Sequence, residues 1–147
     1  MKAKFLYIIA LFVIALDQIT KRLAETRLGL GVTERVFGRL LFLTDIHNRG
    51  GAFGIMQSGT GVLIFISLAV VFVILLSSRR NCYQSTLLTL ALALQLGGAT
   101  GNLIDRVRYG YVVDFIDLGW WPVFNVADAA ITVGIFVLGY QLVARSE

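Results

Sequence analysis

Four long apolar stretches constrain the fold of this chain more than any other feature of its sequence. They lie at about residues 3–21, 61–76, 85–104 and 123–144 of the 147 residues. Crossing about 30 Å of hydrocarbon takes roughly 20 helical residues, and each stretch comes close to that length. We therefore predict a single membrane domain over residues 1–147, an all-α bundle of four transmembrane helices.

The composition supports a membrane protein and argues against a nucleic-acid-binding one. Charged residues make up 15% of the chain and hydrophobic residues 57%, whereas ordinary soluble domains are about 25% charged. The net charge of +4 comes from scattered basic residues in runs no longer than a pair, so nucleic acid is not an expected partner. One Cys and one His cannot form an internal disulfide or a His/Cys zinc site, although carboxylates could hold a hard cation. We expect no metal and no cofactor.

The first apolar stretch has an alternative interpretation as a cleaved signal peptide. Lys2 and Lys4 precede an apolar core of 12 residues, as in a secretory signal. However, Asp17, Gln18 and Thr20 follow this core where a cleavage site would need small residues. A membrane helix is therefore the favoured interpretation.

The segments between the apolar stretches differ in character. The loop over residues 22–60 contains many glycines, mixed charges and short alternations of polar and apolar residues such as 39–44, which predict a small extracytoplasmic sheet on the membrane surface. The stretch 107–122 is too polar to cross the membrane. Its aromatic residues, Tyr109, Tyr111, Trp120 and Trp121, are typical of a membrane-interface belt.

The distribution of charge alone leaves the orientation open. With four crossings, five of the 13 basic residues lie on the side of the termini and eight on the other side, which points away from cytoplasmic termini. Six of those eight lie in or beside the long first loop, where the count is least reliable. We favour cytoplasmic termini.

Four aspartates lie at or just past helix ends that face the same side: Asp17, Asp105, Asp114 and Asp128. A carboxylate at membrane depth costs about 2.5–3.5 kcal/mol, so such residues indicate a functional site. Asp128 lies about one turn inside the fourth predicted helix. Asn125 either caps that helix or shares a face with Asp128.

Two further groups of polar residues have both structural and functional interpretations. Asn102 and Arg106 are spaced i, i+4, and Arg106 could form a salt bridge at a helix end, hold a substrate carbonyl or orient a carboxylate. The i, i+4 spacing of Asp17 and Lys21 favours a structural ion pair. His47 has no partner motif and is interpreted as a plain polar surface residue.

Two apposed carboxylates at the water boundary suit peptide hydrolysis. Like charges a few ångströms apart cannot both ionise, so Asp114 and Asp128 would share one proton. The ionised member could take a proton from water while the protonated member donates to the carbonyl oxygen and then to the leaving nitrogen.

Two other classes of protein are compatible with parts of this pattern. Intramembrane aspartates also serve as ion relays in transporters, although those usually lie nearer the bilayer midplane. A structural assembly subunit could pair its helices through small residues such as Gly97, Gly98 and Gly101, but it would leave Asp114 and Asp128 without a role.

Five ordered motifs resemble those of bacterial lipoprotein signal peptidase, the signal peptidase II family. They are DQITK at residues 17–21, NRGGAF at 48–53, GNLIDR at 101–106, VVDF at 112–115 and FNVAD at 124–128. The resemblance implies that Asp114 and Asp128 form a catalytic dyad. It also implies that several motif residues bind substrate or support the dyad, namely Asn48, Gly50, Asn102, Asp105, Arg106 and Asn125. Asp17 and Lys21 match positions with a structural or supporting role.

The resemblance further implies the substrate and the location. The expected reaction is cleavage of prolipoproteins before a diacylglyceryl-modified cysteine, near the outer leaflet of the bacterial cytoplasmic membrane, with both termini cytoplasmic. The expected partners are these substrates, membrane lipid and globomycin-type cyclic-peptide inhibitors, and the expected state is a monomer. Gly51 and Arg49 depart from the residues that are usual in the family. Phe53, Ile55 and Met56 could form part of a lid over the peptide.

Overall fold

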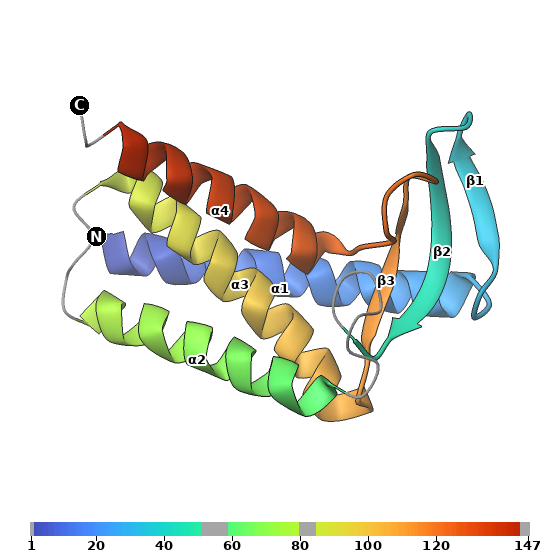
Figure 1. Ribbon diagram of the computed structural model, residues 1–147, viewed down its shortest axis with the longest axis horizontal. Coiled ribbons are helices and arrows are strands. Elements are labelled where there is room, and N and C mark those ends of the chain that lie inside the picture. Colours follow the sequence, from blue (N-terminus) through green and yellow to red (C-terminus); the bar gives the residue numbers. More distant parts are fainter. Residues whose placement is uncertain (1, 51–58, 80–84, 145–147) are drawn as a thin grey trace.

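The computed structural model describes residues 2–50, 59–79 and 85–144. It contains four helices and three strands, shown in Figure 1. In chain order they are α1 (Lys2–Arg27), β1 (Thr33–Phe37), β2 (Leu41–Asn48), α2 (Thr60–Arg79), α3 (Thr86–Tyr109), β3 (Val112–Asp117) and α4 (Val126–Val143). The predictions for Gly51, Phe53, Ile55 and Met56 fall outside the described residues.

The helices form one body with the sheet at one end, and α3 packs against each of the other three helices. The start of α1 and the end of α4 both lie at the end of the bundle opposite the sheet (Figure 1). Glycines on α3 allow this close packing: a Cβ at Gly97 would lie 2.7 Å from Val13 Cβ, and one at Gly98 would collide with the carbonyl oxygen of Ala127. These small residues therefore serve packing within the chain.

Three of the helices are long and apolar enough to cross a membrane, namely α1, α2 and α3. The fourth, α4, contains a shorter apolar stretch, Val126–Gln141. Many apolar side chains of α2 face outward, among them Phe65 and Phe72 at 72% and 65% exposure. This is the surface expected of helices surrounded by lipid.

The helix boundaries differ from the predicted ones at the polar end of the bundle. α1 continues to Arg27 instead of ending near residue 21, and α3 continues to Tyr109 instead of ending near residue 104. α3 ends at Gly110, which adopts the left-handed conformation with φ of 77°, a common helix terminator. The fourth helix starts at Val126 instead of residue 123 because Asn125 caps it. Hydropathy locates the apolar core of a helix but not polar turns added at its end.

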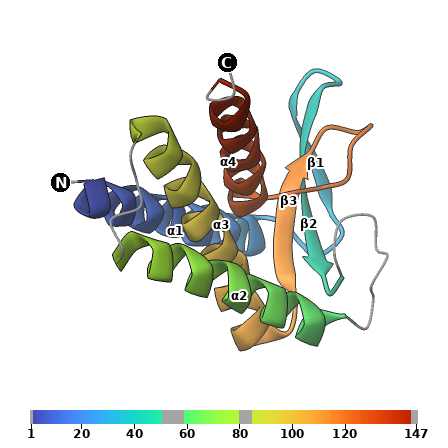
Figure 2. The same cartoon turned by 60° about the vertical axis from the view of Figure 1, so that its left-hand side comes forward.

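The predicted sheet exists, but its third strand comes from a different part of the chain. The order is β1-β2-β3 with both pairs antiparallel, and β3 lies after α3, in the stretch that we predicted to be an interfacial belt. β3 is the strand next to the helices, and β1 is the outer strand (Figure 2). The first four residues of β3 are buried, so it shows little of the polar–apolar alternation that identifies a half-buried strand.

Candidate active site

Asp114 lies in the middle of β3 and is buried, with hydrogen bonds to both of its carboxyl oxygens. Its Oδ2 accepts from Asn48 Nδ2 at 2.8 Å, and its Oδ1 accepts from Asn125 Nδ2 at 2.6 Å. The sheet register explains the first bond: Asp114 pairs with Ile46 on β2, and Asn48 lies two residues further along the same face. The acid is thus held on a strand, not at the end of a helix.

Asp128 lies in the first turn of α4. Its Oδ1 accepts from Asn102 Nδ2 at 2.7 Å, and its backbone N–H donates to Asn125 Oδ1 at 2.9 Å. Within residues 2–50, 59–79 and 85–144, no hydrogen bond is formed by its other oxygen, Oδ2. This oxygen is therefore available to a water molecule or a substrate.

Asn125 links the two aspartates. Its Oδ1 caps α4 by accepting the N–H of Asp128. Because that oxygen faces a donor, the Nδ2 group must face acceptors, and it donates to Asp114 and at 3.2 Å to Asn102 Oδ1. The interpretation of Asn125 as a helix cap is confirmed, and the same side chain also binds the carboxylate of Asp114.

A buried charged cluster lies directly behind this pair. Lys21 Nζ lies 2.8 Å from Asp17 Oδ2, 2.8 Å from Asp105 Oδ2 and 2.9 Å from Asn102 Oδ1. The predicted Asp17–Lys21 ion pair is present, but Lys21 is only 3% exposed and also binds α3. Asp105 and Lys21 thus belong to a junction between α1 and α3.

Arg106 follows Asp105 on α3 and, unlike Asp105, lines the groove that contains the two acids. Among the described residues it forms no ion pair within 4.0 Å, and its buried Nε has no hydrogen-bond partner. The charges of Asp128 and Asp114 act on it electrostatically. The interpretation of Arg106 as a simple salt-bridged helix end is therefore wrong, because the side chain lines the groove without an ion-pair partner among the described residues.

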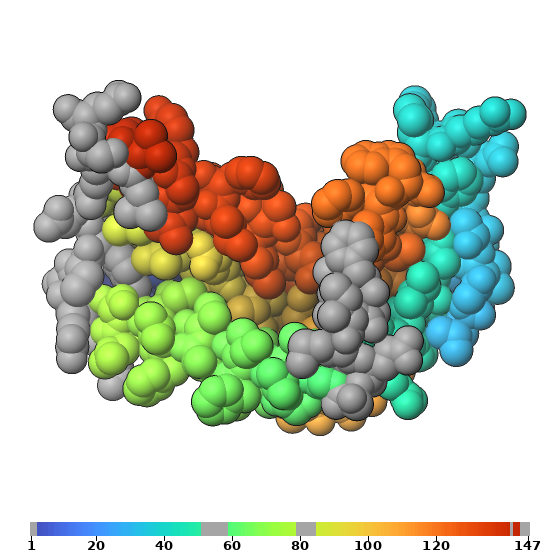
Figure 3. Space-filling view, viewed as in Figure 1, coloured from blue at the N-terminus to red at the C-terminus, as the bar shows by residue number. Residues whose placement is uncertain are grey.

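The groove has a volume of about 1230 Å³ and runs between the end of β2, the segment before α4, and α4 itself. Figure 3 shows the hollow between α4 and the sheet. Its lining combines the polar site residues with a large apolar surface. The lining residues are Ile46, His47, Asn48, Arg49, Gly50, Arg106, Val112, Asp114, Leu118, Trp120, Trp121, Pro122, Val123, Phe124, Asp128, Ala129, Ile131, Thr132, Val133 and Phe136.

His47 and Asn48 at the end of β2, and Gly50 just after it, line this groove. Gly50 N–H donates to Asn48 Oδ1 at 3.0 Å, and since that oxygen faces a donor, the Nδ2 group of Asn48 faces Asp114. His47 is not a plain surface residue, because its ring stacks on Tyr111 at 3.9 Å between centroids and its side chain is only 27% exposed.

The surroundings of Asp114 favour its protonated form. Burial raises the pKa of Asp114 to about 7, and the nearby charge of Asp128 adds to this effect. The hydrogen bonds from Asn48 and Asn125 and the charge of Lys21 oppose the rise. A carboxylic acid that still holds a proton near neutral pH can donate it to a reacting group.

Comparisons with known proteins show the family of this chain. A family model described as signal peptidase (SPase) II matches residues 9–144. The chain belongs to the signal peptidase II family. Lipoprotein signal peptidase of Moorella thermoacetica is 46% identical over 135 residues, covering 92% of this chain and 90% of that protein. Lipoprotein signal peptidase of Caldanaerobacter subterraneus is 47% identical over 139 residues, covering 94% and 95%.

Solved structures show the same fold for this signal peptidase II family member. One bacterial membrane enzyme superposes with a TM-score of 0.92 at 30% identity, covering 98% of this chain and 90% of the other. A second gives 0.86 at 31% identity, covering 95% and 92%. The predicted resemblance is confirmed, and the chain has the fold of a membrane enzyme.

The structure of this family member brings together all the predicted site residues and adds one that we did not predict. Asp114, Asp128, Asn48, Asn102 and Asn125 form one hydrogen-bonded group. Gln18 was missed, although its Nε2 donates to Asp105 Oδ1 at 2.8 Å. Its position beside Asp17 in the first motif was the only signal in the sequence. Among the described residues, no three His, Cys, Asp or Glu side chains gather as metal ligands.

Proposed function

We propose that this chain is an intramembrane aspartic endopeptidase that removes signal peptides from prolipoproteins by cutting before a diacylglyceryl-modified cysteine. The observation that carries the proposal is that Asn125 joins Asp114 to the first turn of the helix that bears Asp128, and both acids line one groove. Membership of a peptidase family supports the reaction class. The names of the relatives support the substrate.

The two aspartates take different parts in the proposed reaction. Asp128, whose Oδ2 forms no hydrogen bond with a described residue, takes a proton from a water molecule as the water oxygen attacks the scissile carbonyl carbon. Asp114, which retains a proton near neutral pH because its pKa is about 7, donates to the carbonyl oxygen. Collapse of the tetrahedral intermediate breaks the C–N bond, and the departing nitrogen takes a proton from the dyad.

The groove suits a lipid-modified peptide. Its polar end contains the dyad and Arg106, whose guanidinium would donate to a substrate carbonyl. Its apolar end consists of residues of α4, such as Val133 and Phe136, which are 51% and 73% exposed. A diacylglyceryl chain would lie along this surface while remaining in lipid, and a globomycin-type cyclic peptide would occupy the same groove.

In the proposed topology, one domain of residues 1–147 crosses the bacterial cytoplasmic membrane four times. The protein would act as a monomer. The 18 residues of α4 span about 27 Å at 1.5 Å per residue, close to the hydrocarbon thickness. Both termini would then be cytoplasmic, with the sheet and dyad near the outer leaflet. Asp114 lies on β3 and Asp128 lies in the first turn of α4. The sheet lies at one end of the bundle (Figure 1), which disfavours an ion relay through the bilayer midplane.

The test is a cleavage assay with the purified protein in lipid. A prolipoprotein peptide with a diacylglyceryl-modified cysteine is compared with the same peptide without lipid, and products are identified by mass spectrometry. We expect a single cut before the modified cysteine, little cleavage of the unmodified peptide, and none with Asp114→Asn. Cleavage that persists in Asp114→Asn and Asp128→Asn, both properly folded, would refute the aspartic mechanism.

A further inference from the structure

A buried ion triad of Lys21, Asp17 and Asp105 lies behind the dyad, between α1 and α3. Lys21 Nζ is 2.8 Å from a carboxyl oxygen of each acid, and all three side chains are at most 3% exposed. None of them lines the groove that contains Asp114 and Asp128. A contact with substrate therefore does not explain why three charges are buried here, which is costly.

The first acid of the triad holds the backbone that carries Asp128. Asp17 Oδ1 accepts the N–H of Ala127 at 2.9 Å, and Ala127 directly precedes Asp128. This N–H belongs to the first turn of α4, where backbone donors lack partners within the helix and favour a negative charge. Gly101 makes room for the carboxylate, since a Cβ there would lie 2.6 Å from Asp17 Oδ2.

The second acid contacts the backbone that carries Asp114. Asp105 Oδ2 accepts the N–H of Val113 at the longer distance of 3.5 Å, and Val113 directly precedes Asp114. Gln18 fixes the other oxygen of Asp105 with a hydrogen bond of 2.8 Å. Each acid of the triad thus touches the residue just before one member of the dyad.

Lys21 also sets the direction of the side chain that binds Asp128. It donates to Asn102 Oδ1 at 2.9 Å. An ammonium group can only donate, so it requires the oxygen end of the Asn102 amide. The Nδ2 end is therefore turned toward Asp128, to which it donates at 2.7 Å.

We propose that Lys21, together with Asp17 and Asp105, is a positioning centre that fixes the separation and orientation of Asp114 and Asp128. This inference rests on the proposed function of the dyad. The triad binds the backbone N–H groups of Ala127 and Val113 and the side chain of Asn102 from outside the groove. Its loss should therefore slow the chemical step and leave substrate binding intact.

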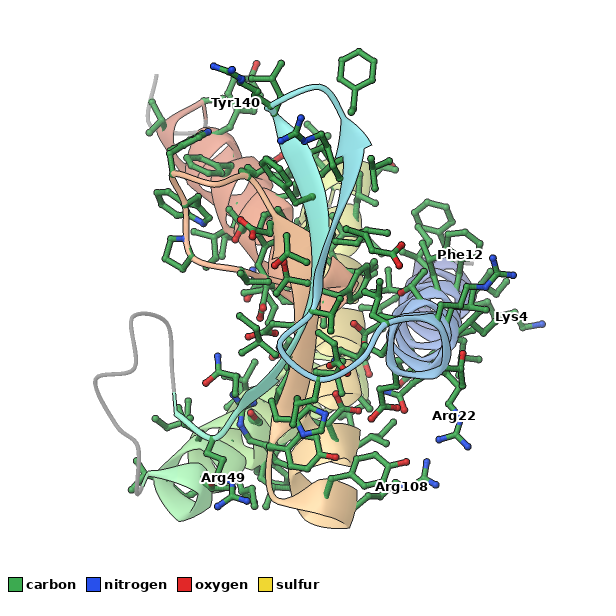
Figure 4. The ribbon with its side chains drawn as sticks, turned by 90° about the vertical axis from the view of Figure 1, so that its right-hand side faces the viewer. Lys4, Phe12, Arg22, Arg49, Arg108 and Tyr140 are labelled. Carbon is green, nitrogen blue, oxygen red and sulfur yellow. The ribbon has the colours of Figure 1, made fainter. Side chains whose placement is uncertain are left out.

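The first test is Lys21→Met, which removes the charge and keeps a long apolar side chain. We expect kcat on the lipidated peptide to fall about 10²-fold, the effect of displacing a catalytic group by about 1 Å, with KM changed less than about twofold. The matched control is Arg22→Met, one residue further along α1. Arg22 points away from the bundle (Figure 4) and its side chain is 71% exposed, so this variant should keep the wild-type kcat.

A second variant addresses folding, because Lys21→Met leaves two buried carboxylates without a counter-charge. The variant Asp17→Asn/Lys21→Met/Asp105→Asn removes all three charges and should fold, with a similar loss of kcat. Thermal unfolding of every variant is measured beside its kinetics. A folded variant with wild-type kcat, or failure of both variants to fold, would overturn the inference and leave the dyad proposal standing if wild type and Arg22→Met cleave. If wild type does not cleave the peptide, the proposed function itself fails.

Discussion

Asp114 on β3 and Asp128 on α4 differ in their burial and in their hydrogen bonds. On β3, both oxygens of Asp114 accept hydrogen bonds and the side chain is buried. On α4, one oxygen of Asp128 accepts from Asn102, and the described residues leave the other without a hydrogen bond. Asp114 on the strand is therefore buried and fully hydrogen-bonded, with a raised pKa. Asp128 at the helix terminus has one oxygen open to the groove.

This difference assigns the two aspartates different roles in the proposed reaction. A buried acid whose pKa is about 7 is suited to hold a proton and donate it. An acid with an open oxygen is suited to orient and deprotonate a water molecule. Asn125 is the only described side chain that hydrogen-bonds both the carboxylate of Asp114 and the first-turn N–H of Asp128. It therefore holds β3 and the start of α4 in a fixed relative position.

The largest expected effect is the loss of either acid. Asp114→Asn and Asp128→Asn should each lower kcat by on the order of 10⁴-fold, because an amide can neither accept the proton of water nor act as a carboxylic acid. The measurement is single-turnover cleavage of the lipidated peptide, with binding of the uncleaved peptide as the control for folding. If one variant kept more than about a tenth of the wild-type activity, only the other aspartate would be catalytic and the dyad mechanism would be wrong.

The next largest effect concerns the link between the two regions. Asn125→Ala removes the helix cap and the bond to Asp114, so we expect kcat to fall about 10²-fold and the free energy of unfolding to fall by about 1 kcal/mol. Kinetics and denaturant unfolding in detergent measure the two effects. Asn125→Asp separates them, since it keeps the cap but faces Asp114 with a charge. Retention of full kcat in Asn125→Asp would show that the bridge is dispensable.

The raised pKa of Asp114 predicts how stability depends on pH. Because the folded-state pKa of about 7 lies above the ordinary value of 3.8, this group stabilises the folded state fully below about pH 4, and the contribution is lost as pH rises to about 7. The total is on the order of 4 kcal/mol. Asp114→Asn should remove this part of the pH dependence when the unfolding temperature is measured between pH 4 and pH 8. Parallel curves for wild type and variant would contradict the assignment.

The smallest expected effect tests the environment on the strand alone. Asn48 donates to Asp114, and this hydrogen bond lowers the pKa of the acid. Asn48→Ala should therefore raise the pKa of Asp114 and move the basic limb of the kcat/KM profile to higher pH, by less than about one unit. Thr33→Ala is a matched control on the same sheet, because Thr33 bonds Thr44 and not the dyad. A shift to lower pH would contradict the proposed role of Asp114 as the proton donor.

Hydropathy was enough to predict the helices, and the costly position of Asp128 indicated a candidate site. The third strand was missed because its first four residues are buried and show little polar–apolar alternation. Its pairing with β2 also joins segments about 70 residues apart. The partners of Lys21 on α3 were missed for a similar reason. The i, i+4 spacing identifies Asp17 as a neighbour of Lys21. The contacts of Lys21 with α3 depend on how the helices pack, which cannot be predicted from the spacing of residues within one helix.

The most direct test of the central claim, that the two aspartates hold one proton between them, is an infrared titration of the purified protein. We expect one protonated carboxyl signal that disappears as pH rises through about 7. That signal should be absent in Asp114→Asn, and in Asp128→Asn it should titrate at lower pH, because the charge of Asp128 helps to raise the pKa of Asp114. A signal that is unchanged in both variants would contradict the account.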